Sequence, residues 1–147
     1  MRIEICPKGR IRFSTKGFND IVDITDEVKK CVKEAGVKDG LCLIFLAGST
    51  GALTTIEYEG GVVSDLLRAL EVLAPMNDDY AHNRKWGDGN GFSHVRSALV
   101  KPSFTVPIED GRPVLGKWQQ IVFIDFDNKP RDRELILKVI SSPKVSE

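Results

Sequence analysis

Both histidines of the chain, His82 and His94, lie in one polar stretch at residues 78–96. The stretch also holds carboxylates, amides and an arginine, which are groups that metal binding and general acid–base catalysis use. It contains Tyr, Trp and Phe as well, whereas disordered segments are poor in aromatic residues. Because long loops inside compact domains are usually functional unless they are disordered, we expect residues 78–96 to form an ordered loop that builds a site.

Glycines at positions 87, 89 and 91 separate the two histidines. Glycines allow tight turns, so the loop can fold back and bring the imidazoles to one point. Two imidazoles with a carboxylate such as Glu57, Asp79 or Asp88 would suit a zinc ion that keeps one coordination position open. Alternatively, one histidine acts as a general base, or each one only bonds loop backbone groups or faces water. The spacing does not decide between these interpretations.

Three further pieces have the chemistry of a binding site. The turn Gly-Ser-Thr-Gly at 48–51 follows an apolar segment, and it either holds an anion on its N–H groups and hydroxyls or is a plain turn. Trp118 and Gln119 precede a predicted strand, where they would line a pocket or close the core. Arg96 would pair with a phosphate or balance nearby aspartates, and it shares a face with His94 only on a strand.

The elements that must position these pieces follow from periodicity and turn signals. Apolar residues at helical spacing predict helices at 25–35 and 62–73. Thr25 is an N-cap candidate for the first helix, which Gly36 ends, and Pro75 ends the second. Strands are expected at 3–5, 11–13, 40–47, 52–57, 103–108, 120–127 and 134–140. Residues 41–47 are continuously apolar and therefore predict a central buried strand, whereas 93–100 fit a helix or a strand. Short turns between the late strands favour an α+β domain with a largely antiparallel sheet or sandwich and two main helices.

Length, charge and cysteine content limit the classes of protein to which this chain can belong. The 147 residues predict one domain over 1–147, with a peripheral strand at 1–12 and a frayed tail at 141–147. Its 21 basic and 21 acidic side chains cancel, which gives no electrostatic footprint for nucleic acid. No apolar run is long enough for a membrane span and no signal peptide is recognised, so we expect a soluble, cytoplasmic protein. Cys6, Cys31 and Cys42 lack metal or redox spacing and are interpreted as small buried hydrophobes.

Five motifs occur in a fixed order along the chain. They are Gly-Ser-Thr-Gly-Ala-Leu-Thr at 48–54, Asp-Tyr-Ala-His-Asn at 79–83, Ser-His-Val-Arg-Ser at 93–97, Pro-Ser at 102–103 and Leu-Gly-Lys-Trp-Gln at 115–119. Each one alone is weak, but together they resemble the YjbQ-like family, often described as secondary thiamine-phosphate synthases, from about residue 13 to 140. The resemblance implies a compact α+β fold, a homotrimer, and in some members a metal ion, zinc by preference, at His82 and His94.

The activity that the resemblance implies joins a hydroxymethylpyrimidine diphosphate to a thiazole phosphate, so a phosphorylated small molecule is the expected partner. The implied catalytic residues are His82, His94, Glu57 and Arg96, and the implied substrate contacts are Ser49, Thr50, Asn83, Trp118 and Gln119. Two departures from the family pattern stand out. Phe92 replaces a residue that is often His or Asp in relatives, which would remove a ligand if that residue holds metal, and Lys117 replaces a usual Thr.

Two other classes of function fit the same residues. The first is a non-catalytic trimeric protein that binds a metal or a phosphorylated metabolite in the same pocket, and Phe92 favours it slightly. The second is a purely structural trimer in which the histidines are polar groups of the interface. Zinc content and turnover discriminate between these classes, because the structural trimer needs neither.

Overall fold

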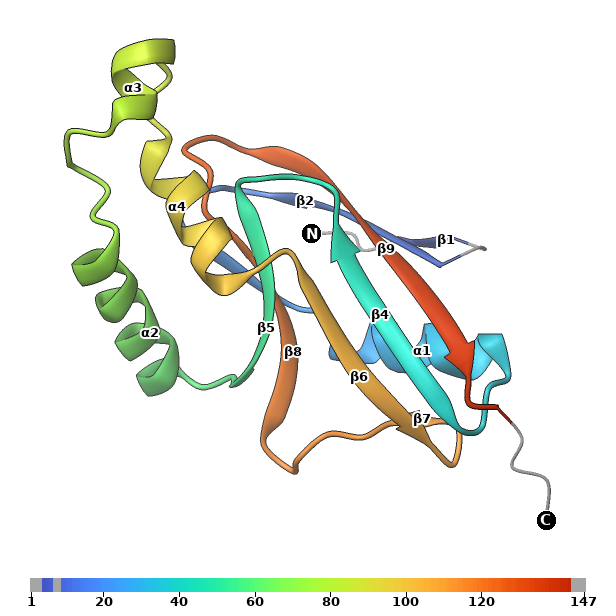
Figure 1. Ribbon diagram of the computed structural model, residues 1–147. Helices are drawn as coiled ribbons and strands as arrows, with labels where there is room; N and C mark the ends of the chain where they lie inside the picture. Colours follow the sequence, from blue (N-terminus) through green and yellow to red (C-terminus); the bar gives the residue numbers. More distant parts are fainter. Residues whose placement is uncertain (1–3, 7–8, 144–147) are drawn as a thin grey trace.

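Antiparallel strands form two sheets in the computed structural model, which describes the backbone of residues 4–6 and all of residues 9–143 (Figure 1). Sheet A has the strand order β1-β2-β9-β4-β6-β7, and sheet B has the order β3-β8-β5. The elements follow the chain in the order β1 (Glu4–Cys6), β2 (Arg10–Thr15), β3 (Asp20–Asp23), α1 (Thr25–Ala35), β4 (Gly40–Leu46), β5 (Gly51–Glu57), α2 (Gly60–Leu73), α3 (Ala81–Trp86), α4 (Gly91–Val100), β6 (Ser103–Glu109), β7 (Arg112–Pro113), β8 (Gln119–Asp125) and β9 (Arg131–Ser141).

The main core lies between the two sheets and α1. Strand β2 alternates along its length, so that Ile11 and Phe13 point inward. Side chains of α1, β4, β8 and β9 complete the same apolar cluster. The ring of Phe13 meets that of Phe123 edge to face, with 5.2 Å between centroids, which joins sheet A to sheet B.

A second, smaller core lies on the other face of sheet B, where α2 and α4 cover it (Figure 1). Strand β8 contributes Val122 and Ile124 to this core while Ile121 and Phe123 belong to the first one. It is therefore buried on both faces, which explains its uninterrupted apolar sequence. The Oγ of Ser97 donates to the backbone oxygen of Gly51 at 2.6 Å and ties α4 to β5.

The structure confirms the α+β class and the antiparallel sheets. It corrects the number of helices, because residues 78–96 are not one loop: they contain α3 and the start of α4. The segment 93–100 is helical, and β3 was not predicted. Strand β4 is central in sheet A, yet it is not fully buried, since Leu41 and Phe45 are exposed on the outer face.

Helix α1 begins as predicted, but a different residue caps it. Asp23, rather than Thr25, accepts the hydrogen bond from the first helical N–H, at 2.9 Å. Thr25 instead uses its hydroxyl oxygen to accept from the N–H of Ile121 at 2.9 Å. The left-handed Gly36 ends the helix as expected.

Several predictions concern the ends of the chain. The predicted first strand begins at residue 3, and the expected frayed tail runs to 147, so both extend into residues 1–3 and 144–147, which lie outside the described residues, as do residues 7–8. The side chain of Cys6 is likewise not described, whereas Cys31 and Cys42 are free and buried. None of the helices in the described part of the chain combines the length and hydropathy needed to cross a membrane.

Candidate functional site

The two histidines converge where α3 and α4 meet. Gly87 and Gly89 both have φ of +70°, a conformation that favours glycine, and they turn the chain back after α3. Gly91 allows the helices to approach, because a Cβ at this position would lie 2.6 Å from the Cβ of Tyr80. As the glycine spacing predicts, the rings of His82 and His94 come to 4.5 Å between centroids.

Oxygen atoms crowd around one nitrogen of His82. Its Nε2 lies 3.1 and 3.2 Å from the two carboxylate oxygens of Asp88. The amide oxygen of Asn90 lies 3.0 Å from the same nitrogen and 3.0 and 3.2 Å from those carboxylate oxygens. His82 and Asp88 are partly exposed, so the cluster is open to solvent on their side, whereas Asn90 is buried.

Asn90 points into this cluster because it does not cap its helix. It precedes α4, where an asparagine usually accepts hydrogen bonds from the first N–H groups, yet its side chain makes no such bond. Its backbone oxygen accepts from Ser93 instead, both from the N–H and from the hydroxyl. The amide is thereby left to bridge His82 on one side and Asp127 on the other.

A buried carboxylate determines which way that amide faces. Asp127 is fully buried, and one of its oxygens accepts from Nδ2 of Asn90 at 3.3 Å and from the N–H of Asn128 at 2.8 Å. Turned over, the Asn90 amide would donate to Asp88 and His82, but its oxygen would then face the Asp127 carboxylate. Because two acceptors facing each other in a buried place cost free energy, Asp127 favours the orientation that sends the amide oxygen toward His82.

Asp127 itself is held ionised by its neighbours. Burial alone would raise its pKa, but hydrogen bonds from Asn128, Arg131 and Asn90 together hold the pKa below its ordinary value. Nε of Arg131 donates to the other Asp127 oxygen at 2.8 Å. The site therefore rests on a fixed negative charge in the interior.

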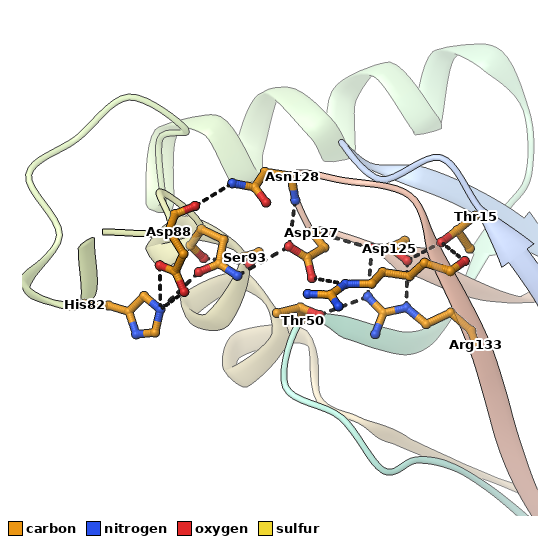
Figure 2. A network of polar contacts seen from close by, with 11 residues as sticks. Thr15, Thr50, His82, Asp88, Ser93, Asp125, Asp127, Asn128 and Arg133 are labelled. Atoms are coloured by element: carbon orange, nitrogen blue, oxygen red, sulfur yellow. Dashed lines mark hydrogen bonds and ion pairs between the residues drawn. The ribbon is translucent and has the colours of Figure 1, made fainter. Parts of the chain in front are cut away.

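A second buried carboxylate, Asp125, continues the network beside the first and accepts from the N–H of Asp127 at 2.9 Å (Figure 2). Arg133 pairs with both of its oxygens, at 2.7 and 2.9 Å, and also donates to the hydroxyl of Thr50 at 2.9 Å. Thr15 contacts the same carboxylate. Thr50 is thus engaged in structure, whereas Ser49, next to it, is exposed.

The structure corrects the position expected for Arg96. Because 93–100 is a helix, Arg96 does not share a face with His94, and its side chain is fully buried. Its guanidinium donates to Glu71, to Asn19 and to the backbone oxygen of Ala74, at 2.6, 2.9 and 2.9 Å. These donors are occupied and shielded, so Arg96 holds α2 against α4 and is not placed to bind a phosphate from solvent.

Phe92 is also accounted for by packing. It is 2% exposed, and the guanidinium carbon of Arg96 lies 5.2 Å from its ring centroid. Two positions separate it from His94 on the helix, so the two side chains point in different directions. Asn83, on α3, accepts from the N–H of Gly91 at 2.9 Å and joins the two helices beside the histidines.

The remaining predicted residues form a separate group. In the β5–β8 ladder, Gly51 pairs with Asp125 at the histidine end, and Glu57 pairs with Gln119 at the other. At roughly 3.3 Å per residue, the six steps of β5 separate these ends by about 20 Å. An open hollow at the far end is lined by Glu57, Trp118 and Gln119. Within one chain, the structure therefore does not bring these residues to the histidines.

The buried part of the site was not predicted from the sequence. Asn90, Asp125, Asp127, Arg131 and Arg133 were not singled out, although one signal was present. Asp-x-Asp ends an apolar strand and is followed, after a turn, by Arg-x-Arg at 131–133. Charges at the end of a buried strand need partners nearby, and this spacing supplies them.

The side chains around His82 supply part of the ligand set expected for a metal ion. Among the side chains that the structure describes, no three from His, Cys, Asp and Glu are arranged to hold a metal ion. His82 and Asp88 supply two such ligands, and the nearest third oxygen belongs to the amide of Asn90. The residues fit a metal when the amide oxygen, an established ligand for hard cations, is counted with them.

Comparison with known proteins supplies the context for this site. The profile described as "UPF0047 protein YjbQ-like" matches residues 9–142. A UPF0047 protein of Archaeoglobus fulgidus is 40% identical over 82% of this chain and 91% of its own length. A UPF0047 protein of Methanocaldococcus jannaschii is 36% identical over 89% of this chain and 92% of its own.

Solved structures agree with these sequence matches. A protein from Sulfolobus solfataricus, described as YbjQ-like and of unknown function, superposes with a TM-score of 0.82 at 27% identity, over 90% of this chain and 96% of that one. A protein of the same family from Clostridium acetobutylicum gives 0.77 at 36% identity, over 88% and 98%. These names correct the expected activity, because the relatives are of unknown function and nothing in the names indicates thiamine-phosphate synthesis.

Proposed function

Since the chain belongs to the YjbQ-like UPF0047 family, whose relatives leave the activity open, we propose a function from the geometry of the site: the chain binds one divalent metal ion beside His82. The ligands are Nε2 of His82, the carboxylate of Asp88 and the amide oxygen of Asn90. His94, whose ring lies 4.5 Å from that of His82 at an angle of 53°, offers a second imidazole. Zinc is the preferred ion, since imidazole nitrogen with carboxylate oxygen is a common ligand set for it.

One observation carries the proposal: three oxygens meet at a single nitrogen, within 3.2 Å of it. The imidazole nitrogen has at most one proton to share among them. The carboxylate and amide oxygens also lie 3.0 and 3.2 Å from each other, where neither can donate. A cation between these atoms would satisfy all of them at once, including the amide oxygen of Asn90, which is buried and has no donor on this side other than His82.

The electrostatics of the surroundings favour the same conclusion. Asp127, behind Asn90, keeps a negative charge in the interior, and the oxygen of Asn90 faces the ion position because its Nδ2 donates to that carboxylate. Such hydrogen bonds to the residues that hold a metal commonly orient them. A bound divalent ion would supply Lewis acidity and lower the pKa of a bound water. The solvent-facing side of the cluster leaves room for a ligand.

The test is a calorimetric titration of metal-stripped protein with Zn²⁺, and with Mn²⁺ and Mg²⁺ for selectivity. We expect one ion per chain, and at least tenfold weaker binding in His82→Ala and in Asp88→Asn. Asp79→Asn is the matched control: it removes the same charge from an exposed aspartate that pairs with Arg84. Unchanged affinity in both site variants, or no saturable binding in the parent protein, would refute the proposal.

We also propose an oligomeric state, a class of ligand and a cellular location. A homotrimer is supported by exposed apolar side chains on the outer face of sheet A, including Leu41, Phe45 and Ile140, and light scattering of the purified protein measures its mass. A phosphorylated small molecule as partner is supported by the open side of the ion site, and calorimetry with the metal-loaded protein tests it. A cytoplasmic location is checked by fractionation of the source cells.

A further inference from the structure

A cavity of about 340 Å³ lies between α1 and the turn that joins β6 to β7. Its apolar lining comes from Val37 after α1, which is partly exposed, and from the buried Val32 on α1 and Pro113 on β7. It lies on a different part of the fold from the histidines: α1 and β7 stand together at the lower right of Figure 1, and α3 lies at the upper left. It is therefore distinct from the proposed metal site.

Four cationic side chains surround this apolar floor. Lys29 and Lys33 come from α1, Lys38 from the segment that follows it, and Arg112 from β7, whereas Asp110 is the one carboxylate that lines the cavity. Among the side chains placed between residues 9 and 143, none forms an ion pair with any of the four cations. The chain as a whole carries no net charge, so this excess of positive charge is local.

Helix stability does not explain the cluster. A cation in the last turn of α1 complements the helix dipole, which accounts for Lys33 alone. Lys29 lies four residues earlier on the same face, and like charges at this spacing are destabilising. Lys38 and Arg112 belong to other elements. The four positive charges at one hollow repel one another in the free protein, and a bound anion would reduce this repulsion.

The backbone builds one wall of the cavity. Asp110 and Gly111 both have positive φ, of 51° and 75°, and the N–H of Gly111 donates to the backbone oxygen of Lys38 at 3.0 Å. The side chain of Lys38 then passes over the glycine, with its Nζ 3.5 Å from where a Cβ would stand. The turn and the end of α1 are thus fixed to each other, and the cationic rim is preformed.

We propose that this cavity binds a small organic anion, with its apolar body against the partly exposed Val37 and its phosphate or carboxylate group among the four cations. A phosphate monoester on an aromatic ring has both parts. Because its floor is apolar, the cavity should bind such a ligand more tightly than a bare ion. Because its rim is cationic, it should also prefer this ligand to a neutral apolar molecule. The proposal does not depend on the metal site.

Phenyl phosphate is the probe, with phenol and inorganic phosphate as the two half-ligands. Calorimetry gives the affinity, and amide chemical shifts in ¹H–¹⁵N spectra give the location. We expect saturable binding of phenyl phosphate that weakens with added salt, with the largest shifts at Gly36, Lys38 and Gly111. Phenol and inorganic phosphate should each bind at least tenfold more weakly than the probe.

Charge-removing variants complete the test. Lys33→Gln with Arg112→Gln should weaken phenyl phosphate by about tenfold, since two unit charges near the anion are lost. Lys85→Gln with Lys138→Gln removes the same charge from two exposed positions elsewhere and should leave the affinity unchanged. Equal loss in both double variants, shifts that map to another surface, or no saturable binding would overturn the proposal. Equal affinity for inorganic phosphate would overturn the role of the apolar floor.

Discussion

Replacing the buried Asp127 by asparagine should weaken metal binding although this residue does not touch the proposed ion. In the native protein its carboxylate accepts from Nδ2 of Asn90 at 3.3 Å and so directs the amide oxygen toward His82. An asparagine at 127 can donate as well as accept, so Asn90 is free to turn and present its NH₂ group to His82 and Asp88. A donor in that place repels a cation.

The size of the effect follows from known behaviour of such supporting residues. Removing a group that orients a metal ligand typically costs 10- to 100-fold in affinity, or about 1.4 to 2.7 kcal/mol. Asp127→Asn also loses charge-assisted hydrogen bonds with Arg131 and Asn128, which should lower the free energy of unfolding by about 1.5 to 3 kcal/mol. Arg131 is 39% exposed, so its charge can turn to solvent, which favours the lower end of that range.

Asp125→Asn is the matched control. Asp125 is an equally buried carboxylate in the same network and pairs with Arg133, but its carboxylate accepts from Thr15, Arg133 and the N–H of Asp127 rather than from Asn90. Both variants should lose stability in urea unfolding, and only Asp127→Asn should lose affinity for Zn²⁺ in calorimetry. If Asp127→Asn binds within threefold of the parent protein, or if both variants weaken binding equally, the orienting role of Asp127 is wrong.

The same variant has a signature in pH. The pKa of Asp127 in the folded protein lies below its ordinary value, so its contribution to stability is present above about pH 4 and is lost as the pH falls through the folded-state pKa. The free energy of unfolding of the parent protein should therefore decline below about pH 4. Asp127→Asn should remove part of that decline, and an identical pH profile for both proteins would contradict the assignment.

Three other predictions concern the fold around the site. Burial, and then the neighbouring Cys31, raise the pKa of Cys42 to about 12, so its thiol should react with a disulfide reagent about a hundredfold more slowly in the native than in the unfolded protein; equal rates would refute this. Gly91→Ala should cost about 1 to 3 kcal/mol in urea unfolding and weaken metal binding, because its Cβ has no space, while the unobstructed Gly60→Ala should leave metal binding intact. Arg96→Leu should cost about 2 kcal/mol, since it leaves a buried backbone oxygen unpaired; a cost no larger than that of the exposed Arg68→Leu would contradict the structural role.

Local sequence signals predicted the elements well where short-range chemistry decides the outcome. The periodicity of α1 and α2 and the left-handed Gly36 are properties of neighbouring residues, and the structure confirms them. The glycines at 87, 89 and 91 correctly indicated that His82 and His94 approach each other. Residues 93–100 remained ambiguous because a short apolar run fits either a helix or a strand.

The composition of the site could not be predicted, because it depends on pairing between distant segments. Glu57 and Trp118 were grouped with the histidines by their residue types, yet the register of β5 against β8 puts them at the opposite end. Arg96 was expected to pair with a phosphate or to balance nearby aspartates, but three partners hold it inside: one on α2, the residue that follows α2, and one before β3. Asn90 and Asp127 are 37 positions apart, and no local pattern joins them.

The central claim is that a divalent ion lies between His82, Asp88 and Asn90, and diffraction from metal-loaded crystals tests it most directly. Data collected on either side of the zinc absorption edge locate the ion without reference to the protein atoms. The claim predicts one anomalous peak per chain, about 2.0 to 2.2 Å from Nε2 of His82 and from a carboxylate oxygen of Asp88, with the amide oxygen of Asn90 facing it. No peak there at saturating zinc, with the Asn90 amide turned to donate to Asp88, would contradict the claim.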